Sequence, residues 1–188
     1  MLFRSVLTGM TAPGTASEMY PALANALLGT RFKLISGYEG AGAMNLALER
    51  GEIEAVGANS WLSLIVTKPE WVEGGKITPL FQTTLVRDPA LATTPTLLEL
   101  ASSDDARAVI SFEARAEEIG FYLMAPPGVP AERIAVLREA FAAMAHNPDY
   151  LAEAKNLNMG TNFLGGAELQ NIAAAEAATP SVIVESLD

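Results

Sequence analysis

Three hydroxyl side chains and a glycine lie close together near the start of the chain, in the run TAPGTAS from Thr11 to Ser17. An amphipathic pattern follows, so the run is expected to open a helix. Backbone N–H groups at a helix N-terminus have no helical partner and lie at the positive end of the helix dipole, where they favour an anion. Gly14 lets the backbone approach a ligand closely, and hydroxyls such as that of Thr15 can donate to carboxylate oxygens. We therefore predict a carboxylate cradle made of Thr11, Ala12, Gly14, Thr15, Ala16 and Ser17.

A purely structural role suits part of the same run. Thr15 and Ser17 can cap the helix, and Thr15 to Glu18 has the form of a capping box. Lysine and arginine are sparse around the loop, which favours recognition by neutral donors over ion pairing. The residues by themselves leave capping and ligand binding both open.

Two further glycine-bearing runs, SGYEGAG (Ser36 to Gly42) and GANS (Gly57 to Ser60), each follow a short apolar run. The glycine order in the first, GxxGxG, is neither a dinucleotide fingerprint nor a Walker loop, so no nucleotide cofactor is predicted. We interpret it as a strand-to-helix turn that also lines the ligand site through Gly40. Asn59 and Ser60 either face the ligand or cap a helix, and capping is the safer interpretation.

Residues suited to catalysis are few. The single histidine, His146, lies at the end of an amphipathic helix, and that position explains it without catalysis. There is no cysteine, no GxSxG elbow and no histidine pair for a metal. Glu49, Glu52 and Glu54 fall at positions that splay them apart, which indicates a solvated face rather than an acid–base pair. Trp61 has the helical spacing of a core residue. We therefore predict a protein that is not an enzyme and holds no metal or cofactor, with an α/β hydrolytic enzyme as a less favoured alternative.

The first sixty residues supply the elements that would present the cradle. Apolar runs predict strands at Phe3 to Leu7, Phe32 to Ile35 and Ile53 to Val56. Helical patterns lie between them, from near Ser17 to a left-handed cap at Gly29 and from Ala43 to Arg50. This βαβαβ order predicts a parallel sheet with right-handed crossovers. The three loops then meet at the carboxyl edge of the sheet, where open α/β sheets bind ligands.

Weaker signals follow these elements. We predict a helix from Asn59 or Ser60 that ends before Gly74, an extended stretch from Ile77 to Leu85, and a loop-rich domain crossing beyond Val86. The other predicted elements are a helix from Thr96 to Ala101, a strand from Gly120 to Ala125, two amphipathic helices after Ala131, and a last helix from Gly166 to near Val182.

Composition narrows the class of protein. The chain has 188 residues, of which 50% are hydrophobic and 18% are charged, so it is globular and long enough for a real core. The net charge is −10 and no lysine or arginine cluster occurs, so neither nucleic acid nor an anionic membrane surface is an expected partner. Thr8, Gly9 and Thr11 interrupt the first apolar stretch, which indicates a strand and not a signal peptide.

Five segments, taken in order, resemble one known family. They are APGTAS, GYEGAGAMNLALERGEIEA, GKITPLFQT, TPTLLELA and LMAPPGVPAERIAVLREAFAAMAHNPDYLAEAKNL. Their order and spacing are similar to the C-terminal part of the solute receptors of tripartite tricarboxylate transporters, also called Bug receptors. The resemblance implies a bilobed, type II periplasmic-binding-protein fold that closes around a small carboxylate and delivers it to the membrane permease subunits of the transporter. It also implies a periplasmic location.

The resemblance divides the chain into two parts. Residues 1–84 resemble the α/β ligand-binding lobe, and residues 85–188 resemble the crossover and the C-terminal helices of an incomplete first lobe. The N-terminal half-lobe and the signal peptide of the family have no counterpart in this chain, so we expect a half-built carboxylate site and reduced activity. A ligand-sensing regulatory domain with the same fold is an alternative, although no basic DNA-binding segment is present.

Overall fold

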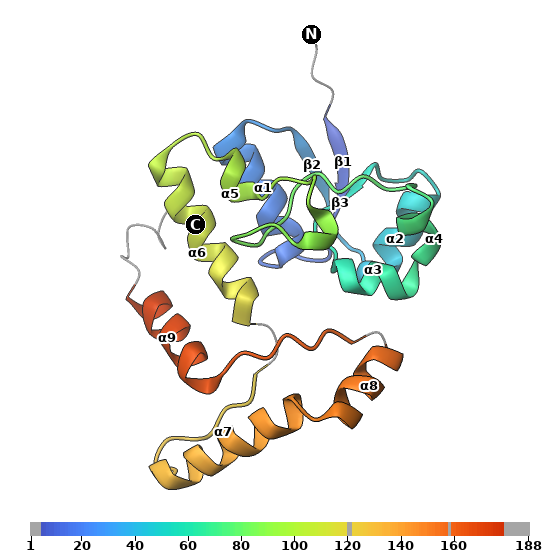
Figure 1. Ribbon diagram of the computed structural model, residues 1–188. Coiled ribbons are helices and arrows are strands. Elements are labelled where there is room, and N and C mark those ends of the chain that lie inside the picture. The colour runs from blue at the N-terminus through green and yellow to red at the C-terminus, as the bar shows by residue number, and fades with distance from the viewer. Residues whose placement is uncertain (1–4, 120–121, 158, 179–188) are drawn as a thin grey trace. The chain divides into compact units, whose positions relative to one another are not determined.

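The structure is a computed structural model, and it describes residues 5–119, 122–157 and 159–178 (Figure 1). The chain divides into two compact units, Met1–Ser111 and Phe112–Asp188. The boundary falls inside helix α6, Asp104–Ile119. It does not coincide with the predicted division after residue 84, because residues up to Ile110 pack into the first unit. The assignment of the two parts to family lobes stays a prediction.

A three-stranded parallel sheet in the order β2-β1-β3 forms the centre of the first unit (Figure 1). Its strands are β1 (Val6–Gly9), β2 (Phe32–Ile35) and β3 (Ala55–Val56). The predicted second strand is confirmed residue for residue. The first strand runs further than predicted, to Gly9, and residues 3–4 of the predicted strand lie outside the described range. The predicted parallel βαβαβ order is therefore confirmed.

Two helices make the crossovers between the strands, and each lies beside the sheet (Figure 1). They are α1 (Ala16–Leu28) and α2 (Ala41–Glu49). Helix α1 ends at Gly29, whose φ of 68° is left-handed, as predicted. Pro21 lies inside α1 and has no N–H, so the carbonyl of Ser17 receives no helical hydrogen bond from it.

The prediction of one continuous helix after Ser60 is wrong, because the segment forms two helices, α3 (Trp61–Thr67) and α4 (Pro69–Glu73). The break falls at Lys68, whose φ of −141° and ψ of 53° are not helical. Proline disfavours a helical conformation in the residue before it, so Pro69 accounts for the break.

The main apolar core joins α1 to later parts of the chain. Tyr20 and Ala24 of α1 pack with Leu97, Ala106 and Ile110. Helix α5 (Leu97–Leu100) carries a complete capping box formed by Thr96 and Glu99, and η1 (Pro89–Leu91) precedes it. The core therefore ties the sheet unit to α5 and to the first half of α6.

Helix α6 is not among the predicted elements, because the sequence beyond Val86 was interpreted as a loop-rich crossing. The side chain of Ser103 accepts from the N–H of Ala106 at 3.2 Å, as an N-cap does. Two acidic residues in the first turn, Asp104 and Asp105, suit the helix dipole. Ser103 followed by two aspartates was therefore a signal for the start of a helix, which the sequence analysis interpreted as a loop.

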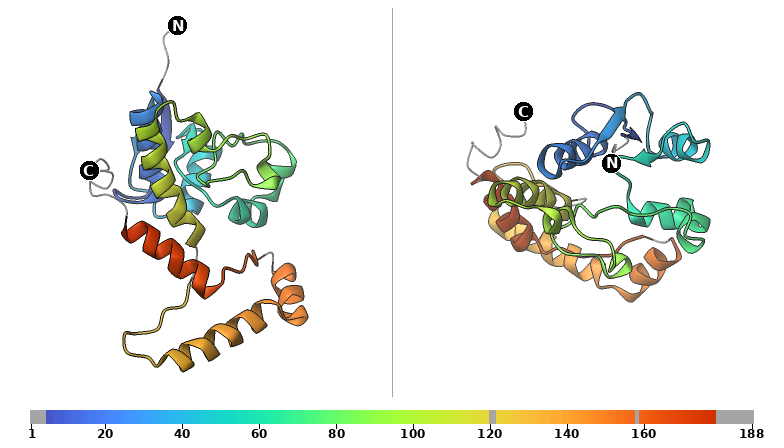
Figure 2. Two further views of the ribbon diagram at one scale, coloured as in Figure 1. Left: turned by 60° about the vertical axis from the view of Figure 1, so that its left-hand side comes forward. Right: turned by 90° about the horizontal axis from the view of Figure 1, so that it is seen from above.

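Helices α7 (Ala131–Ala145), α8 (Pro148–Asn156) and α9 (Gly166–Ala177) lie in the second unit, and Figure 2 shows an extended stretch joining α8 to α9. Asn147 caps α8 by accepting from the N–H groups of Asp149 and Tyr150. The predicted strand from 120 to 125 is wrong over residues 122–125, which form no strand; residues 120–121 lie outside the described range. The predicted end of the last helix, near residue 182, also lies outside the described range.

Candidate functional site

The loops after β1, β2 and β3 meet at the carboxyl edge of the sheet, as the strand order requires. The N–H of Gly57, after β3, donates to the carbonyl of Gly9 at 3.0 Å. The N–H of Gly37, after β2, donates to the carbonyl of Thr11 at 3.2 Å. Backbone hydrogen bonds therefore hold the outer two loops against the loop that carries the predicted cradle.

The hydroxyls of Thr11, Thr15 and Ser17 form one cluster. The Oγ1 atoms of Thr11 and Thr15 are 3.1 Å apart, and Ser17 Oγ lies 3.1 Å from the first and 2.9 Å from the second. The N–H of Thr11 also donates to Ser17 Oγ at 3.0 Å, and the Ser17 side chain is buried. The three predicted hydroxyl residues are thus brought together and held in place.

Helix capping does not account for these hydroxyls. Thr15 is the N-cap residue of α1, but its side chain accepts no hydrogen bond from the first turn. Its Oγ1 instead donates to the carbonyl of Ala12 at 2.7 Å. Glu18 does not reach back to Thr15 either, because its Oε2 accepts from the N–H of Gly14 at 2.6 Å. The run thus has the form of a capping box without its hydrogen bonds.

The first turn of α1 retains unused donors. Among the residues that the structure describes, the N–H groups of Thr15, Ala16 and Ser17 have no hydrogen-bond acceptor. The next two N–H groups along the helix both donate to the carbonyl of Thr15. Three adjacent donors at the positive end of a 13-residue helix can hold an anion without a basic side chain.

The weaker candidates have structural roles. Gly40 is the N-cap residue of α2, and its carbonyl accepts from the N–H of Met44 at 3.1 Å. Ser60 caps α3, since its Oγ accepts from the N–H of Ser63 at 3.3 Å, which confirms the capping interpretation. The Asn59 side chain donates to Oδ1 of the buried Asn45 at 2.9 Å. Gly40, Asn59 and Ser60 thus shape the loops around the cradle.

Gly57, the first residue of the GANS run, was given no role from the sequence, yet it lies directly against the first turn of α1. A Cβ atom at this position would lie 1.9 Å from the carbonyl oxygen and 2.8 Å from the carbonyl carbon of Ser17. Only glycine permits this approach of the third loop to the first turn of α1. The signal in the sequence was a glycine directly after a strand, which marks close backbone approach.

Trp61, interpreted as core from its spacing, holds a buried donor. Its indole Nε1 is buried and finds no acceptor among the described residues. A buried N–H without a partner is uncommon in native structures and calls for an explanation. It lies at the start of α3, directly after the loop that contacts the cradle.

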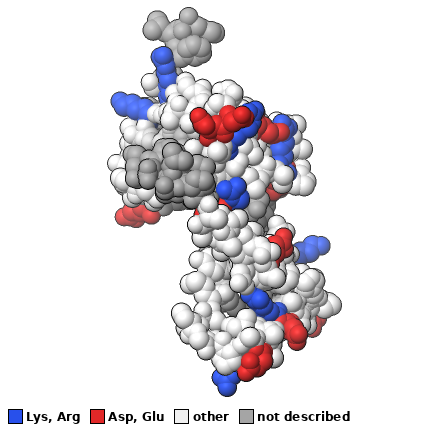
Figure 3. Space-filling view, turned by 90° about the vertical axis from the view of Figure 1, so that its left-hand side faces the viewer, with Lys and Arg blue, Asp and Glu red and all other residues white. Residues whose placement is uncertain are grey.

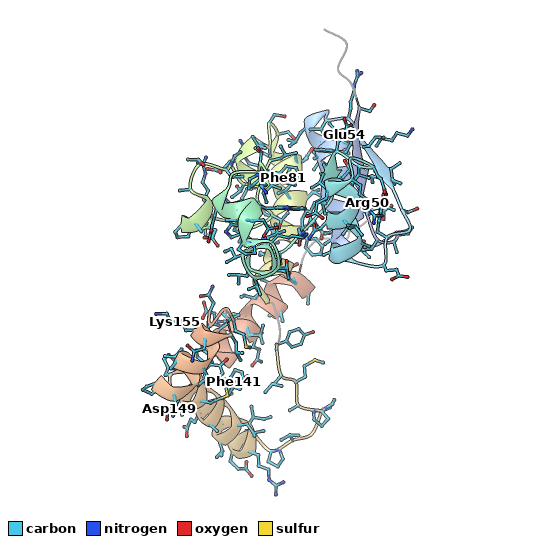
Figure 4. The ribbon with its side chains drawn as sticks, turned by 90° about the vertical axis from the view of Figure 1, so that its right-hand side faces the viewer. Arg50, Glu54, Phe81, Phe141, Asp149 and Lys155 are labelled. Atoms are coloured by element: carbon cyan, nitrogen blue, oxygen red, sulfur yellow. The ribbon has the colours of Figure 1, made fainter. Side chains whose placement is uncertain are left out.

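The charged groups near the sheet do not form an acid–base pair. Lys68 donates to Glu49 at 2.7 Å, and this hydrogen bond holds the pKa of the Glu49 carboxyl below its usual value. Glu54 accepts from the N–H of Leu7 at 3.1 Å, while Glu52 lies 3.8 Å from Arg50 (Figure 4 labels Arg50 and Glu54). The three glutamates therefore have separate partners, as their spacing predicts.

Neither a metal site nor a catalytic histidine is visible in the described part of the chain. His146 Nδ1 lies 2.7 Å from the carbonyl of Ala142, and its ring meets Phe163 edge-on at 5.3 Å. Residues 5–119, 122–157 and 159–178 contain no cluster of metal-ligating side chains. None of their helices combines the length and apolar character needed to cross a bilayer.

Two solved structures are similar to the chain over nearly its whole length. One is a TctC solute binding protein from Polaromonas, solved without ligand, with a TM-score of 0.63 and 21% identity over 97% of this chain and 57% of that one. The chain has the fold of a TctC-type solute-binding protein. The other structure is an R. palustris protein with adipate, with a TM-score of 0.56 and 21% identity over 98% of this chain and 56% of that one.

The similarity confirms the predicted fold class, a periplasmic-binding-protein-like α/β fold. The chain spans less than three fifths of the length of either solved structure. No family model and no curated protein matches it.

Proposed function

We propose that the chain is the solute-binding component of a tripartite tricarboxylate-type transporter and that it binds a small carboxylate at the N-terminus of α1. The observation that carries the proposal is the set of unused N–H groups of Thr15, Ala16 and Ser17. They lie beside the hydroxyl cluster at the carboxyl edge of a parallel sheet, where ligands bind in open α/β folds. A protein of the same fold has been solved with adipate, a small dicarboxylate, which supports this class of ligand.

The proposed binding mode uses neutral donors. One carboxylate oxygen accepts from the backbone N–H groups of Ala16 and Ser17, and the other accepts from a hydroxyl of the cluster. The hydroxyls donate to one another and to Ala12 in the structure, so one of them rotates toward the ligand on binding. The proposed contacts involve no acid, base or nucleophile, so we propose that the site binds its ligand and does not catalyse a reaction.

Location and partners complete the proposal. As the solute-binding component of such a transporter, the chain would be located in the periplasm and would deliver its ligand to the membrane permease subunits. The chain matches less than three fifths of the length of either solved structure. We therefore propose weak binding, that is, reduced activity, for these 188 residues by themselves.

Calorimetric titration with adipate, succinate and citrate tests the proposal. Thr15→Val and Ser17→Ala each remove a hydroxyl from the cluster, and Thr67→Val removes one from α3 as a matched control, where Thr67 donates to the carbonyl of Ser63. A hydrogen bond to a charged group contributes about 1.5–3 kcal/mol, so each cluster variant should weaken binding about 10- to 100-fold. Binding to none of the acids, or equal affinity in all three variants, would overturn the proposal.

A further inference from the structure

Two side chains near the cradle keep hydrogen-bond donors for which the described residues supply no acceptor. Asn45 of α2 is 5% exposed, and its Oδ1 accepts from Nδ2 of Asn59 at 2.9 Å. Its own Nδ2 carries two N–H donors, and no described residue accepts from them. Trp61, two residues after Asn59, has the buried indole N–H that finds no acceptor there either. Unused donors on buried side chains are rare in native proteins and call for an acceptor.

Packing brings both residues close to the point where β1 ends and the cradle loop begins. Met44, which precedes Asn45 in α2, packs over this point, because its Cγ lies 3.5 Å from the position that a Cβ atom of Gly9 would take. The loop with Asn59 begins at Gly57, whose N–H donates to the carbonyl of Gly9 at 3.0 Å. The hydrogen bond between Asn45 and Asn59 then joins α2 to this loop. The unused donors therefore lie at the same edge of the sheet as the proposed carboxylate site.

The fold by itself does not require these polar groups. Leucine would fill the position of Asn45, and phenylalanine that of Trp61, without burying an unpaired donor, which destabilises a folded protein. The hydrogen bond from Asn59 fixes the amide plane of Asn45 and so fixes the direction of its free N–H groups. Sites for small molecules are built from a few polar groups that are held in place before the ligand arrives. The two side chains therefore have the features of ligand recognition.

The charges in this region favour an uncharged acceptor. The lysine that follows α3, Lys68, is already paired with Glu49 of α2 at 2.7 Å. A carboxylate offers about four lone-pair sites, and its burial against neutral donors without a free cation would be costly. The chain carries a net charge of −10, and on the face shown in Figure 3 lysine and arginine side chains lie singly or beside acidic ones. This field disfavours a second negative charge on the ligand.

We propose that Asn45 and Trp61 recognise the oxygen of a carboxamide group at the far end of a small carboxylic acid, whose carboxylate lies at the N-terminus of α1. Asn59 is a positioning residue for Asn45, and its Oδ1, which accepts from no described donor, suits the N–H groups of the same carboxamide. A carboxamide thus matches the free donors and the free acceptor together, whereas a carboxylate matches the donors alone. The inference rests on the proposed function and narrows its ligand to monoamides of dicarboxylic acids.

Calorimetric titration of the full chain with two series of acids tests this preference. Butyrate, 4-hydroxybutyrate, succinate and succinamate share a four-carbon chain and one carboxylate, and they end in a methyl, hydroxyl, carboxylate and carboxamide group. Hexanoate, 6-hydroxyhexanoate, adipate and adipamate repeat the comparison on a six-carbon chain. Two additional hydrogen bonds should make one of the monoamides bind at least about tenfold more tightly than the acids of its own series that end in a methyl or a carboxylate group.

Two substitutions and one spectroscopic signal show whether the preference comes from these residues. Asn45→Leu and Trp61→Phe should each bring the affinity of the monoamide down to that of the methyl-terminated acid. Trp71→Phe in α4 is the matched control, because it makes the same substitution at the other tryptophan, and it should keep the preference. In the unsubstituted ¹⁵N-labelled chain, the indole signal of Trp61 should shift with the monoamide and not with the methyl-terminated acid, while that of Trp71 stays in place.

The other possible results separate this inference from the proposed function. Equal affinities within each series, with Thr15→Val still weakening all of them, would overturn the inference and leave the proposed function standing. Tightest binding of a diacid or a hydroxy acid would overturn it in favour of another end group. A monoamide preference that survives both substitutions, or a Trp61 signal that stays unchanged at saturation, would mean that the carboxamide is recognised elsewhere. Binding of no acid at all would overturn the inference and the proposed function together.

Discussion

Substitution of one glycine should disturb the proposed cradle without touching any of its donors. In Gly57→Ala the new methyl group would lie 1.9 Å from the Ser17 carbonyl oxygen, whereas real Cβ atoms stay beyond 3.0 Å. The third loop and the first turn of α1 must therefore separate by about 1.1 Å, because both neighbours are backbone and cannot rotate away. Both the stability of the first unit and the geometry of the donors should suffer.

The size of the effect follows from the cost of overpacking. Forcing extra methyl groups into a packed site costs roughly 1–3 kcal/mol, which corresponds to a fall in the unfolding midpoint of roughly 4–12 °C for a unit of this size. Carboxylate affinity should fall by about tenfold, since one charge-assisted hydrogen bond contributes about 1.5 kcal/mol or more. Differential scanning fluorimetry and calorimetric titration measure the two effects.

Gly42→Ala is the matched control for this experiment. Gly42 lies in α2, is exposed, and has no atom within 4 Å of the position of its Cβ. Alanine is the better helix former, so this variant should be more stable than the parent chain by roughly 0.5–1 kcal/mol, with unchanged affinity. Equal unfolding midpoints for the Gly57 and Gly42 variants would refute the steric argument.

Three further predictions concern other parts of the first unit. Glu18→Gln removes a carboxylate from the cradle, where it accepts from Gly14 N–H, so carboxylate affinity by calorimetry should rise by about 2- to 5-fold; a fall would show that Glu18 supports the ligand. Thr96→Ala breaks the capping box of α5 at a buried position and should cost about 0.5–2 kcal/mol in urea unfolding; no loss would mean that the cap is dispensable. The pKa of Glu49 is lowered by Lys68, so the pair stabilises the fold above the ordinary carboxyl pKa of 4.5 and loses that effect as pH falls through the lowered value. Lys68→Met should therefore lower the unfolding midpoint at pH 7 and leave it unchanged at strongly acidic pH, and an equal deficit at both would contradict the linkage.

Sequence periodicity was sufficient to predict the strands and helices that carry the cradle. The run Phe32 to Ile35 lies between turn signals, and Gly29 supplies the left-handed residue that ends α1, so both were predictable locally. The parallel order then brought all three loops to one edge without any knowledge of tertiary contacts.

Other features depend on contacts that sequence spacing does not encode. The Thr15 to Glu18 run has the letters of a capping box, but the left-handed Gly14, with φ of 77°, places its own N–H in reach of Glu18. The closeness of Gly57 to Ser17 joins positions 40 residues apart. The stretch 122–125 was predicted as a strand because it is apolar, whereas a strand also needs a partner for its backbone, and the described residues supply none.

Amide spectra of the ¹⁵N-labelled chain titrated with adipate measure binding at the cradle directly. We expect the backbone signals of Thr15, Ala16 and Ser17 to shift together and saturably, because their N–H groups are the unused donors of α1. The same titration of Thr15→Val should require about 10- to 100-fold more adipate for the same shifts. Unchanged signals at these three residues, or saturable shifts confined to another part of the chain, would contradict carboxylate binding at the N-terminus of α1.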